Sequence, residues 1–224
     1  MYLPLLLNDG RMYLNIEGQL WLIDTGSAVS FSNNRKLVLA GESFELEEHY
    51  LGFDIEILNG QLSLACEGLL GTDIINRFDW IFDLKNQQAR FSRSELPLLQ
   101  NQIKADFSFQ CPIINIEMLG QSQPMFFDTG SQFSYHLERD ITQCQQNGKL
   151  HDYSPAVGYF NSDSFIVDVD VLGIKRGEIM GFLPETSPLC SNLKPFKVKG
   201  ILGNKTITEH TLGYHPSRQI ISLA

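Results

Sequence analysis

The chain contains the same six-residue pattern twice, and this repeat constrains the fold more than any other feature. Two apolar residues precede Asp-Thr-Gly-Ser over residues 22–27 and again over residues 126–131, so Asp128 follows Asp24 by 104 positions (128 − 24). At average composition, a given tetrapeptide occurs by chance in a chain of this length only roughly a few times in a thousand. Two copies therefore indicate a duplicated architecture.

Two further landmarks recur in the same order. Upstream, Leu-Asn-Ile-Glu at 14–17 matches Ile-Asn-Ile-Glu at 114–117. The second copy thus has four more residues before its Asp-Thr-Gly-Ser, at a place where a hairpin turn is expected. Downstream, Gly-Leu-Leu-Gly at 68–71 returns as Gly-Ile-Leu-Gly at 200–203, each followed by a helix-capping residue and a short segment predicted as helical.

Alternating apolar and polar residues around turn dipeptides predict β-strands in both halves. Hairpins are expected around Glu17-Gly18, Leu119-Gly120 and Asn59-Gly60, the last with strands over 53–58 and 61–65. Another strand is expected over 165–172, with Asp168 and Asp170 on its solvent face. Little else has a helical period, so the predicted fold class is all-β.

The halves are predicted to form two lobes, over residues 1–96 and 105–224. Between them, residues 97–104 are predicted as a linker, because Pro97 and a run of polar residues are typical of connectors.

Composition excludes several functional classes. A hydrophobic content of 43% in 224 residues supports a globular core, and 17 Lys+Arg against 26 Asp+Glu, with no basic run, argue against a nucleic-acid partner. The apolar stretch at residues 3–7 is too short to span a membrane and lacks the basic flank of a secretion signal, so we expect no membrane contact and a cytoplasmic location. Four separate cysteines and five histidines form no metal-binding motif, so neither a metal nor another cofactor is expected.

The residues before each repeated aspartate point to its chemistry. A single Asp-Thr-Gly is compatible with an ordinary turn, but apolar residues draw each strand into the core and carry Asp24 and Asp128 inside, where an unpaired carboxylate is costly. If the repeats pack about a pseudo-twofold axis, the two carboxylates meet and share one proton. The ionised member can then deprotonate a water while the protonated member donates to a carbonyl oxygen, as amide hydrolysis requires.

With these motifs the sequence resembles the retropepsin-like aspartic proteases, with two Asp-Thr-Gly-Ser halves fused in one chain as in the pepsin arrangement. The resemblance covers nearly the whole chain. It implies the acid-protease fold: two similar β-barrel-like lobes related by a pseudo-twofold axis, with a shared inter-lobe sheet built from residues 2–7, 88–92, 105–110 and 219–223. It also implies Asp24 and Asp128 as the catalytic pair of an active monomer.

The resemblance assigns supporting roles to other residues of the motifs. Thr25 and Thr129 would brace the two loops by mutual hydrogen bonds, and Gly26 and Gly130 would allow close backbone approach. The Leu-Gly segments would buttress the loops, through Leu70, Gly71, Leu202 and Gly203.

The serines of the motifs carry an expectation about pH. The resemblance to pepsin-type turns implies that the hydroxyls of Ser27 and Ser131 donate to the outer carboxylate oxygens, which would lower the apparent pKa of the pair. We therefore expect optimal activity on the acid side of neutrality.

The two halves differ in the segment between landmarks, where the family has a hairpin flap. Asp24 to Gly71 is 47 positions (71 − 24) and Asp128 to Gly203 is 75 (203 − 128), so the second segment is 28 residues longer (75 − 47). A short flap is expected over residues 44–53 and a dominant one over residues 151–167. The flap residues proposed to bind substrate are Tyr50, Gly52, Gly158 and Tyr159, with Tyr159 over the cleft. Alternatively, Tyr153, Tyr159 and Phe160 are ordinary packing aromatics.

Two functions are compatible with these features. The first is an endopeptidase that hydrolyses extended peptides through general acid/base catalysis, with no covalent intermediate. The alternative is a non-catalytic module that holds a peptide on a protease-like scaffold.

Overall fold

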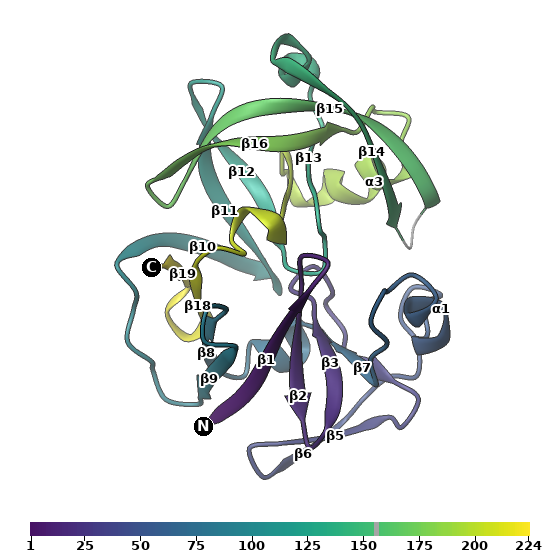
Figure 1. Cartoon of the computed structure of the whole chain (residues 1–224), viewed down its shortest axis with the longest axis vertical. Coiled ribbons are helices and arrows are strands. Elements are labelled where there is room, and N and C mark those ends of the chain that lie inside the picture. Colours follow the sequence, from purple (N-terminus) through teal and green to yellow (C-terminus); the bar gives the residue numbers. More distant parts are fainter. Residues whose placement is uncertain (155–156) are drawn as a thin grey trace.

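The computed structural model describes residues 1–154 and 157–224 and divides into two lobes (Figure 1). The N-terminal half, coloured purple to blue, lies below the second half, coloured teal to green. The last strands of the chain return to the side of the first lobe. In the described part of the chain, none of the helices has the length and apolar character needed to cross a bilayer.

The first lobe is built on one open sheet. Its strands, in spatial order, are β1 (Tyr2–Asn8), β2 (Arg11–Ile16), β3 (Gln19–Ile23), β7 (Gly68–Leu70) and β4 (Phe31–Ser32). β3 and β7 are parallel, so both lead their C-terminal ends to the centre of the molecule. The remaining elements are a ribbon of β5 (Lys36–Leu39) and β6 (Glu42–Glu45) and the helices α1 (Ile55–Asn59) and α2 (Thr72–Ile75).

The second lobe is a closed ring of strands. The ring follows the order β11 (Cys111–Met118), β12 (Gln121–Asp128), β17 (Gly200–Gly203), β13 (Ser134–His136), β16 (Ile174–Phe182) and β15 (Gly158–Val171), and β15 pairs back with β11. β14 (Gln145–Ser154) extends β15 as a long hairpin. Short helices complete the half: η1 (Arg139–Gln143), α3 (Pro188–Leu193), η2 (Lys194–Phe196), η3 (Asn204–Thr206) and η4 (Pro216–Arg218).

A six-stranded antiparallel sheet joins the lobes, as expected from the sequence, but its membership differs from the prediction. Its order is β1, β9 (Gln88–Ser92), β8 (Asp79–Asp83), β18 (Thr211–His215), β19 (Ile220–Leu223) and β10 (Asn101–Phe109). β10 joins it through residues 101–104 rather than 105–110, and two strands that were not predicted, β8 and β18 from opposite halves of the chain, form its middle. Beneath it the buried Trp80 stacks on Phe82 and Phe91, with ring centroids 5.4 and 4.8 Å away.

The four extra residues of the second copy lengthen strands rather than a turn. Glu17-Gly18 and Leu119-Gly120 are both two-residue turns with left-handed φ angles, 54° and 88° in the first and 52° and 74° in the second. Such paired positive angles match the twist of a tight hairpin. The insertion therefore extends the β11–β12 hairpin by two residues on each strand relative to β2–β3, without changing the connection.

The hairpin predicted around Asn59-Gly60 is wrong, because residues 55–59 form helix α1. The Asp54 carboxylate accepts a hydrogen bond from the Ile57 N–H (2.8 Å) and caps the helix. Ile55 and Leu58, three residues apart, both face the core, and Gly60 has a right-handed φ of −65° that a tight hairpin turn would not use.

The segment between the lobes is shifted from its predicted position. Residues 101–104 belong to β10 and pair with β19, so residues 93–100 connect the last strand of the first lobe to β10. The buried Asp79 carboxylate holds this connection by accepting a hydrogen bond from the Leu96 N–H (3.0 Å).

Candidate active site

The fold delivers the two repeated aspartates to one point at the centre of the molecule. Asp24 directly follows β3, and its N–H donates to the Leu70 carbonyl of the parallel β7 (3.0 Å). Asp128 ends β12 and is aligned with Gly203 of the parallel β17. Each aspartate is thus fixed at the end of a buried strand and is itself a half-buried residue.

Each carboxyl group packs against the glycine of the opposite motif. A Cβ atom placed on Gly26 would lie 2.4 Å from Cγ of Asp128, and one on Gly130 would lie 2.4 Å from Cγ of Asp24. No side chain fits at such a distance, so both positions require glycine. This reciprocal packing brings the two carboxyl groups together, within hydrogen-bonding reach of each other.

The two threonines tie the loops together below the carboxyl groups. The Thr25 hydroxyl accepts from the Thr129 N–H (3.0 Å) and donates to the Phe127 carbonyl (2.8 Å). The Thr129 hydroxyl in turn accepts from the Thr25 N–H (3.0 Å) and donates to the Ile23 carbonyl (3.1 Å). Both threonines are buried, so these four bonds lock the spacing of the aspartates.

Backbone N–H groups hold one oxygen of each carboxyl group. Oδ1 of Asp24 accepts from Gly26 (2.8 Å) and Ser27 (3.1 Å), and Oδ1 of Asp128 accepts from Gly130 (2.9 Å) and Ser131 (3.1 Å). Each inner oxygen is therefore oriented by its own loop.

The serine hydroxyls do not have the role predicted from the sequence. The Ser27 hydroxyl donates to the Val29 carbonyl (2.8 Å), and the Ser131 hydroxyl donates to the Phe133 carbonyl (2.9 Å). Because the carbonyl two residues ahead is within reach of each hydroxyl, these side chains close their own turns and leave the carboxylates to the backbone.

The Leu-Gly segments lie directly against the two Asp-Thr-Gly loops. A Cβ on Gly71 would lie 2.6 Å from the backbone carbon of Val29, and one on Gly203 would lie 2.3 Å from the Phe133 oxygen. Leu70 and Leu202, just before these glycines, are fully buried.

Two serines missed in the sequence attach these segments to the loops. The Gly71 N–H donates to the Ser30 hydroxyl (2.8 Å), and the Gly203 N–H donates to the Ser134 hydroxyl (3.0 Å). Ser30 and Ser134 are also 104 positions apart (134 − 30), so the repeat is Asp-Thr-Gly-Ser-x-x-Ser and its spacing was the signal that could have identified them.

The site favours retention of a proton on the aspartate pair. Burial raises the pKa of Asp24 well above its usual range, and the charge of Asp128 and the hydrogen bond between the two carboxyls raise it further. Burial also raises the pKa of Asp128, opposed by the hydrogen bond from Asp24, by its backbone N–H bonds and by the charge of Arg11. This corrects the expected lowering by serine hydroxyls: burial dominates, so the pair keeps one proton to higher pH than ordinary carboxyl groups.

Both aspartates lie in a cavity of about 650 Å³ between the lobes. Its walls are mostly apolar and come from both halves of the chain. The first lobe contributes Leu22, Phe31, Phe53, Leu58, Leu62 and Leu69, and the second contributes Phe126, Tyr135, Phe160, Leu193, Phe196 and Ile201. A polar floor between apolar walls suits a ligand with a polar backbone and apolar side chains.

The β14–β15 hairpin covers the cavity from the second lobe. Tyr153 lines the cavity and contacts Phe53 of the first lobe, with ring centroids 5.8 Å apart. Phe160 also lines it and packs on Tyr135 at 5.7 Å. Residues 155–156, within the predicted flap, lie outside the described residues. The second lobe therefore supplies a lid that reaches across to the first.

The structure corrects the position predicted for Tyr159. This side chain is 77% exposed and does not line the cavity, and Gly158 at the start of β15 does not line it either. Successive residues of a strand face opposite sides, so Phe160 faces the cavity and Tyr159 faces away. Tyr159 instead packs edge-on against Tyr153, with centroids 5.0 Å apart.

The short flap predicted in the first lobe is a single tight turn. Tyr50 and Phe53 exchange two backbone hydrogen bonds (2.8 and 2.9 Å), with left-handed φ angles at Leu51 (51°) and Gly52 (81°). Tyr50 and Leu51 line the cavity, whereas Gly52 shapes the turn without lining it.

Two other cavity residues were not predicted, because they lie outside the repeated motifs. Arg11 opens β2 and lines the cavity beside the second-lobe motif. Cys111 is buried, with its Sγ 3.6 Å from the Gly26 carbonyl, and burial raises the pKa of its thiol to about 12. The two residues occupy equivalent positions, 100 apart (111 − 11) like the landmarks at 14–17 and 114–117, but their residue types differ, so the repeat did not identify them.

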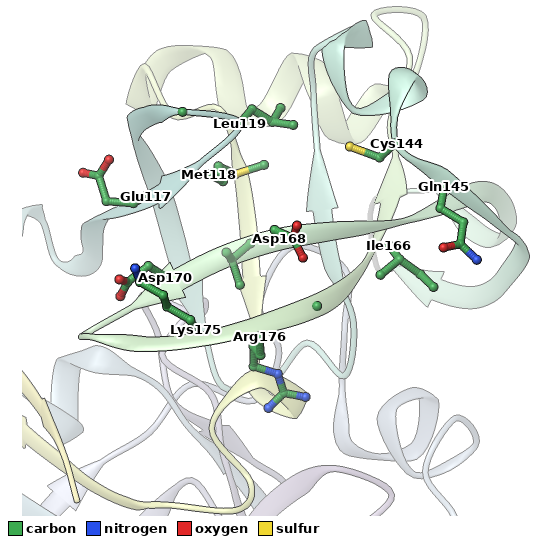
Figure 2. A pocket seen from close by; sticks show the side chains of 13 residues that line it. Glu117, Met118, Leu119, Cys144, Gln145, Ile166, Asp168, Asp170, Lys175 and Arg176 are labelled. Atoms are coloured by element: carbon green, nitrogen blue, oxygen red, sulfur yellow. The ribbon is translucent and has the colours of Figure 1, made fainter.

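A larger hollow, about 870 Å³, lies on the outer face of the second lobe (Figure 2). It is lined by the β11–β12 turn and by β15 and β16, and it includes Asp168 and Asp170. No residue of either Asp-Thr-Gly-Ser motif lines it. We therefore assign the candidate active site to the cavity that contains the two aspartates.

Comparisons with known proteins agree with this architecture. No protein-family profile and no curated sequence matches the chain. Among solved structures, the chain is similar to the crystal structure of the aspartic proteinase from Irpex lacteus, with a TM-score of 0.52 and 9% sequence identity over 100% of this chain and 96% of that chain. At this identity the similarity concerns the fold. The protein therefore has a pepsin-like, all-β acid-protease fold and a protease-like scaffold.

Proposed function

We propose that the protein is an aspartic endopeptidase in which one chain supplies both catalytic aspartates. The observation that carries the proposal is the reciprocal packing of Asp24 and Asp128 on each other's glycines, at the floor of one cavity. Carboxyl groups this close cannot both ionise readily, so one acts as a base and the other as an acid.

The proposed reaction uses the two protonation states together. The ionised carboxylate takes a proton from a water held between the aspartates, and the water oxygen attacks the peptide carbonyl carbon. The protonated carboxyl donates to the carbonyl oxygen, which gives a neutral tetrahedral diol. The protonated carboxyl then gives its proton to the nitrogen while the other carboxylate takes a proton from a hydroxyl of the diol. The C–N bond breaks, a carbonyl forms again, and one proton is left on the pair. No covalent intermediate with the protein forms.

The cavity supports a peptide in an extended conformation as the substrate. Apolar walls on both sides of the aspartates fit side chains that point alternately to either lobe, as they do along an extended strand. The β14–β15 hairpin lies where it can exclude water from the bound segment. We propose that a single monomer is active, since both acids come from the same chain.

The test is cleavage of a mixed peptide library by the wild-type protein and by Asp24→Asn and Asp128→Asn. We expect cleavage by the wild type and a loss of at least about 1,000-fold in either variant, because the acids act as one unit. Asp168→Asn makes the same chemical change on the outer face and should retain full activity. Activity that survives both substitutions at the dyad would exclude this mechanism. Tight peptide binding without cleavage at any pH would favour a non-catalytic binding module.

A further inference from the structure

The aspartate cavity contains an unusual positive charge. Among the described residues that line it, Arg11 is the only Lys, Arg or His, whereas Asp24, Asp128 and Asp152 are acidic. Asp152 already accepts a hydrogen bond from the Tyr135 hydroxyl (2.6 Å). Within the described part of the chain, Arg11 forms no ion pair with a carboxylate. Its guanidinium donors thus remain available to a ligand.

The backbone at Arg11 is held by both lobes. The preceding residue, Gly10, accepts a hydrogen bond at its carbonyl from Nδ2 of Asn204 in the second lobe (2.6 Å). A Cβ on Gly10 would lie 3.3 Å from Cγ of Gln132, so this turn packs directly on the loop that follows Asp128. In the first lobe, Nδ2 of Asn8 donates to the Ser63 hydroxyl (2.6 Å). Arg11 is therefore fixed relative to the dyad.

The acidic residue nearest in sequence does not neutralise this charge. The Asp9 carboxylate accepts a hydrogen bond from the Ser63 hydroxyl and so has its own partner. Along β2, alternation places Arg11 on the same face as Tyr13, which belongs to the apolar cluster that continues into the cavity wall through Leu22 and Phe31. The guanidinium is thus associated with the cavity face of the first lobe.

A carboxylate is the group that such a position recognises best. Guanidinium and carboxylate groups form paired, charge-assisted hydrogen bonds, which are stronger beside apolar walls than in bulk water. The protein carries a formal net charge of −9, so it offers no general attraction for acidic peptides. A preference for a negative charge would have to come from Arg11 itself.

We propose that Arg11 binds a carboxylate of the substrate and makes the protein selective for peptides with a negative charge at one position beside the scissile bond. This inference rests on the proposed peptidase function. The carboxylate belongs either to an Asp or Glu side chain or to the free C-terminus of a short peptide, because both present the same group to the guanidinium.

The experiment measures kcat/KM on matched peptides built around a sequence cleaved in the library. In one arm, Glu is compared with Gln at each position on both sides of the scissile bond. In the other, a free C-terminal acid is compared with the C-terminal amide. For the wild type we expect roughly 10- to 100-fold faster cleavage of the charged peptide at one position or one terminus, which identifies the source of the carboxylate.

The variants separate recognition from a structural role. Arg11→Gln should abolish the preference, and Arg11→Glu should reverse it in favour of Lys at the same position. Arg35→Gln removes the same charge from an exposed site of the first lobe and should keep the preference. Wild-type cleavage of charged and neutral peptides at equal rates in both arms would overturn the role of Arg11 and leave the peptidase function intact. If the wild type cleaves neither peptide, the peptidase function itself fails.

Discussion

The two lobes hold their aspartates in nearly the same way but surround them differently. The N–H bonds to Asp24 (2.8 and 3.1 Å) have counterparts at Asp128 (2.9 and 3.1 Å), and the Ser30 bond to Gly71 (2.8 Å) has its counterpart at Ser134 (3.0 Å). The segments between each Asp-Thr-Gly-Ser motif and its Leu-Gly segment have different structures. The first lobe has a two-stranded ribbon, a tight turn and a short helix there, and the second lobe has a long hairpin. Symmetry is thus kept for the groups that hold the proton and lost in the parts that would contact a ligand.

The two lobes also differ in how they enclose the cavity. The second lobe is a closed ring and carries the lid, whereas the first is an open sheet that offers Phe53 as the point of contact for Tyr153. A ligand in the cavity would therefore meet two unlike walls above two like acids. Each of the following predictions tests one side of this contrast.

The largest effect is expected from a methyl group at either central glycine. Gly26→Ala and Gly130→Ala should each lower kcat/KM by at least about 100-fold, because the new atom would displace the opposite aspartate from its partner. Gly60→Ala, at a right-handed position whose Cβ would have nothing closer than 3.4 Å, should behave like the wild type. A large loss at one motif and none at the other would disprove the equivalence of the two carboxyl positions.

The cross-axis threonines should contribute equally to stability. Thr25→Ala and Thr129→Ala each leave a buried N–H and a buried carbonyl without a partner, which should lower the free energy of unfolding by about 2–4 kcal/mol. Urea denaturation measures this loss. Serine at the same positions keeps the hydroxyl and should recover most of it. Failure of serine to do so would show that the methyl group, rather than the hydrogen bonds, is what matters.

The lid should act through Tyr153 and not through Tyr159. Tyr153→Ala removes a cavity side chain and its contact with Phe53, and we expect KM to rise about tenfold. Tyr159→Ala makes the same change on a ring that is 77% exposed, and KM should stay within about twofold. A larger rise in KM for Tyr159→Ala than for Tyr153→Ala would show that Tyr159 is the lid residue that contacts substrate.

The smallest effect concerns stability against pH. The folded-state pKa values of Asp24 and Asp128 are raised, so their contribution to stability is fully present below the unfolded carboxyl pKa and is lost as the pH rises through the folded values. Asn at either position removes this loss. Each Asp→Asn variant should therefore melt about 2–4 °C above the wild type at neutral pH, with no gain in strong acid. Melting curves with no pH-dependent difference would contradict the raised pKa values.

The repeat made much of the architecture predictable. The duplication and the all-β fold follow from two motifs that recur in order: Asp-Thr-Gly-Ser after two apolar residues, and then apolar-Leu-Gly. These motifs are informative because each has the same structural role in both halves. The strand over Phe165–Leu172 was predictable too, since period-two alternation continues through Val171 at the end of β15.

Where the sequence-based predictions were wrong, local hydrogen bonds or strand register decided the structure. Asn59-Gly60 looks like a turn, but Asp54 caps a helix before it. The Ser27 hydroxyl bonds the Val29 carbonyl two residues ahead, which the motif does not reveal. The face on which Tyr159 lies depends on the register of one hairpin, which a shift of one residue reverses. The position equivalent to Arg11 in the second half is occupied by Cys111, so the repeat does not mark the arginine, which reaches the cavity only through tertiary packing.

The pairing of β8 with β18 has a consequence for biosynthesis. Strand β18 (Thr211–His215) pairs on one side with β8, which leaves the ribosome far earlier, and on the other side with β19 (Ile220–Leu223). Contacts so distant along the chain close late and slowly during folding. A nascent polypeptide would thus carry both aspartates before the sheet that joins the halves is complete, and the proposed peptidase activity would require this last segment.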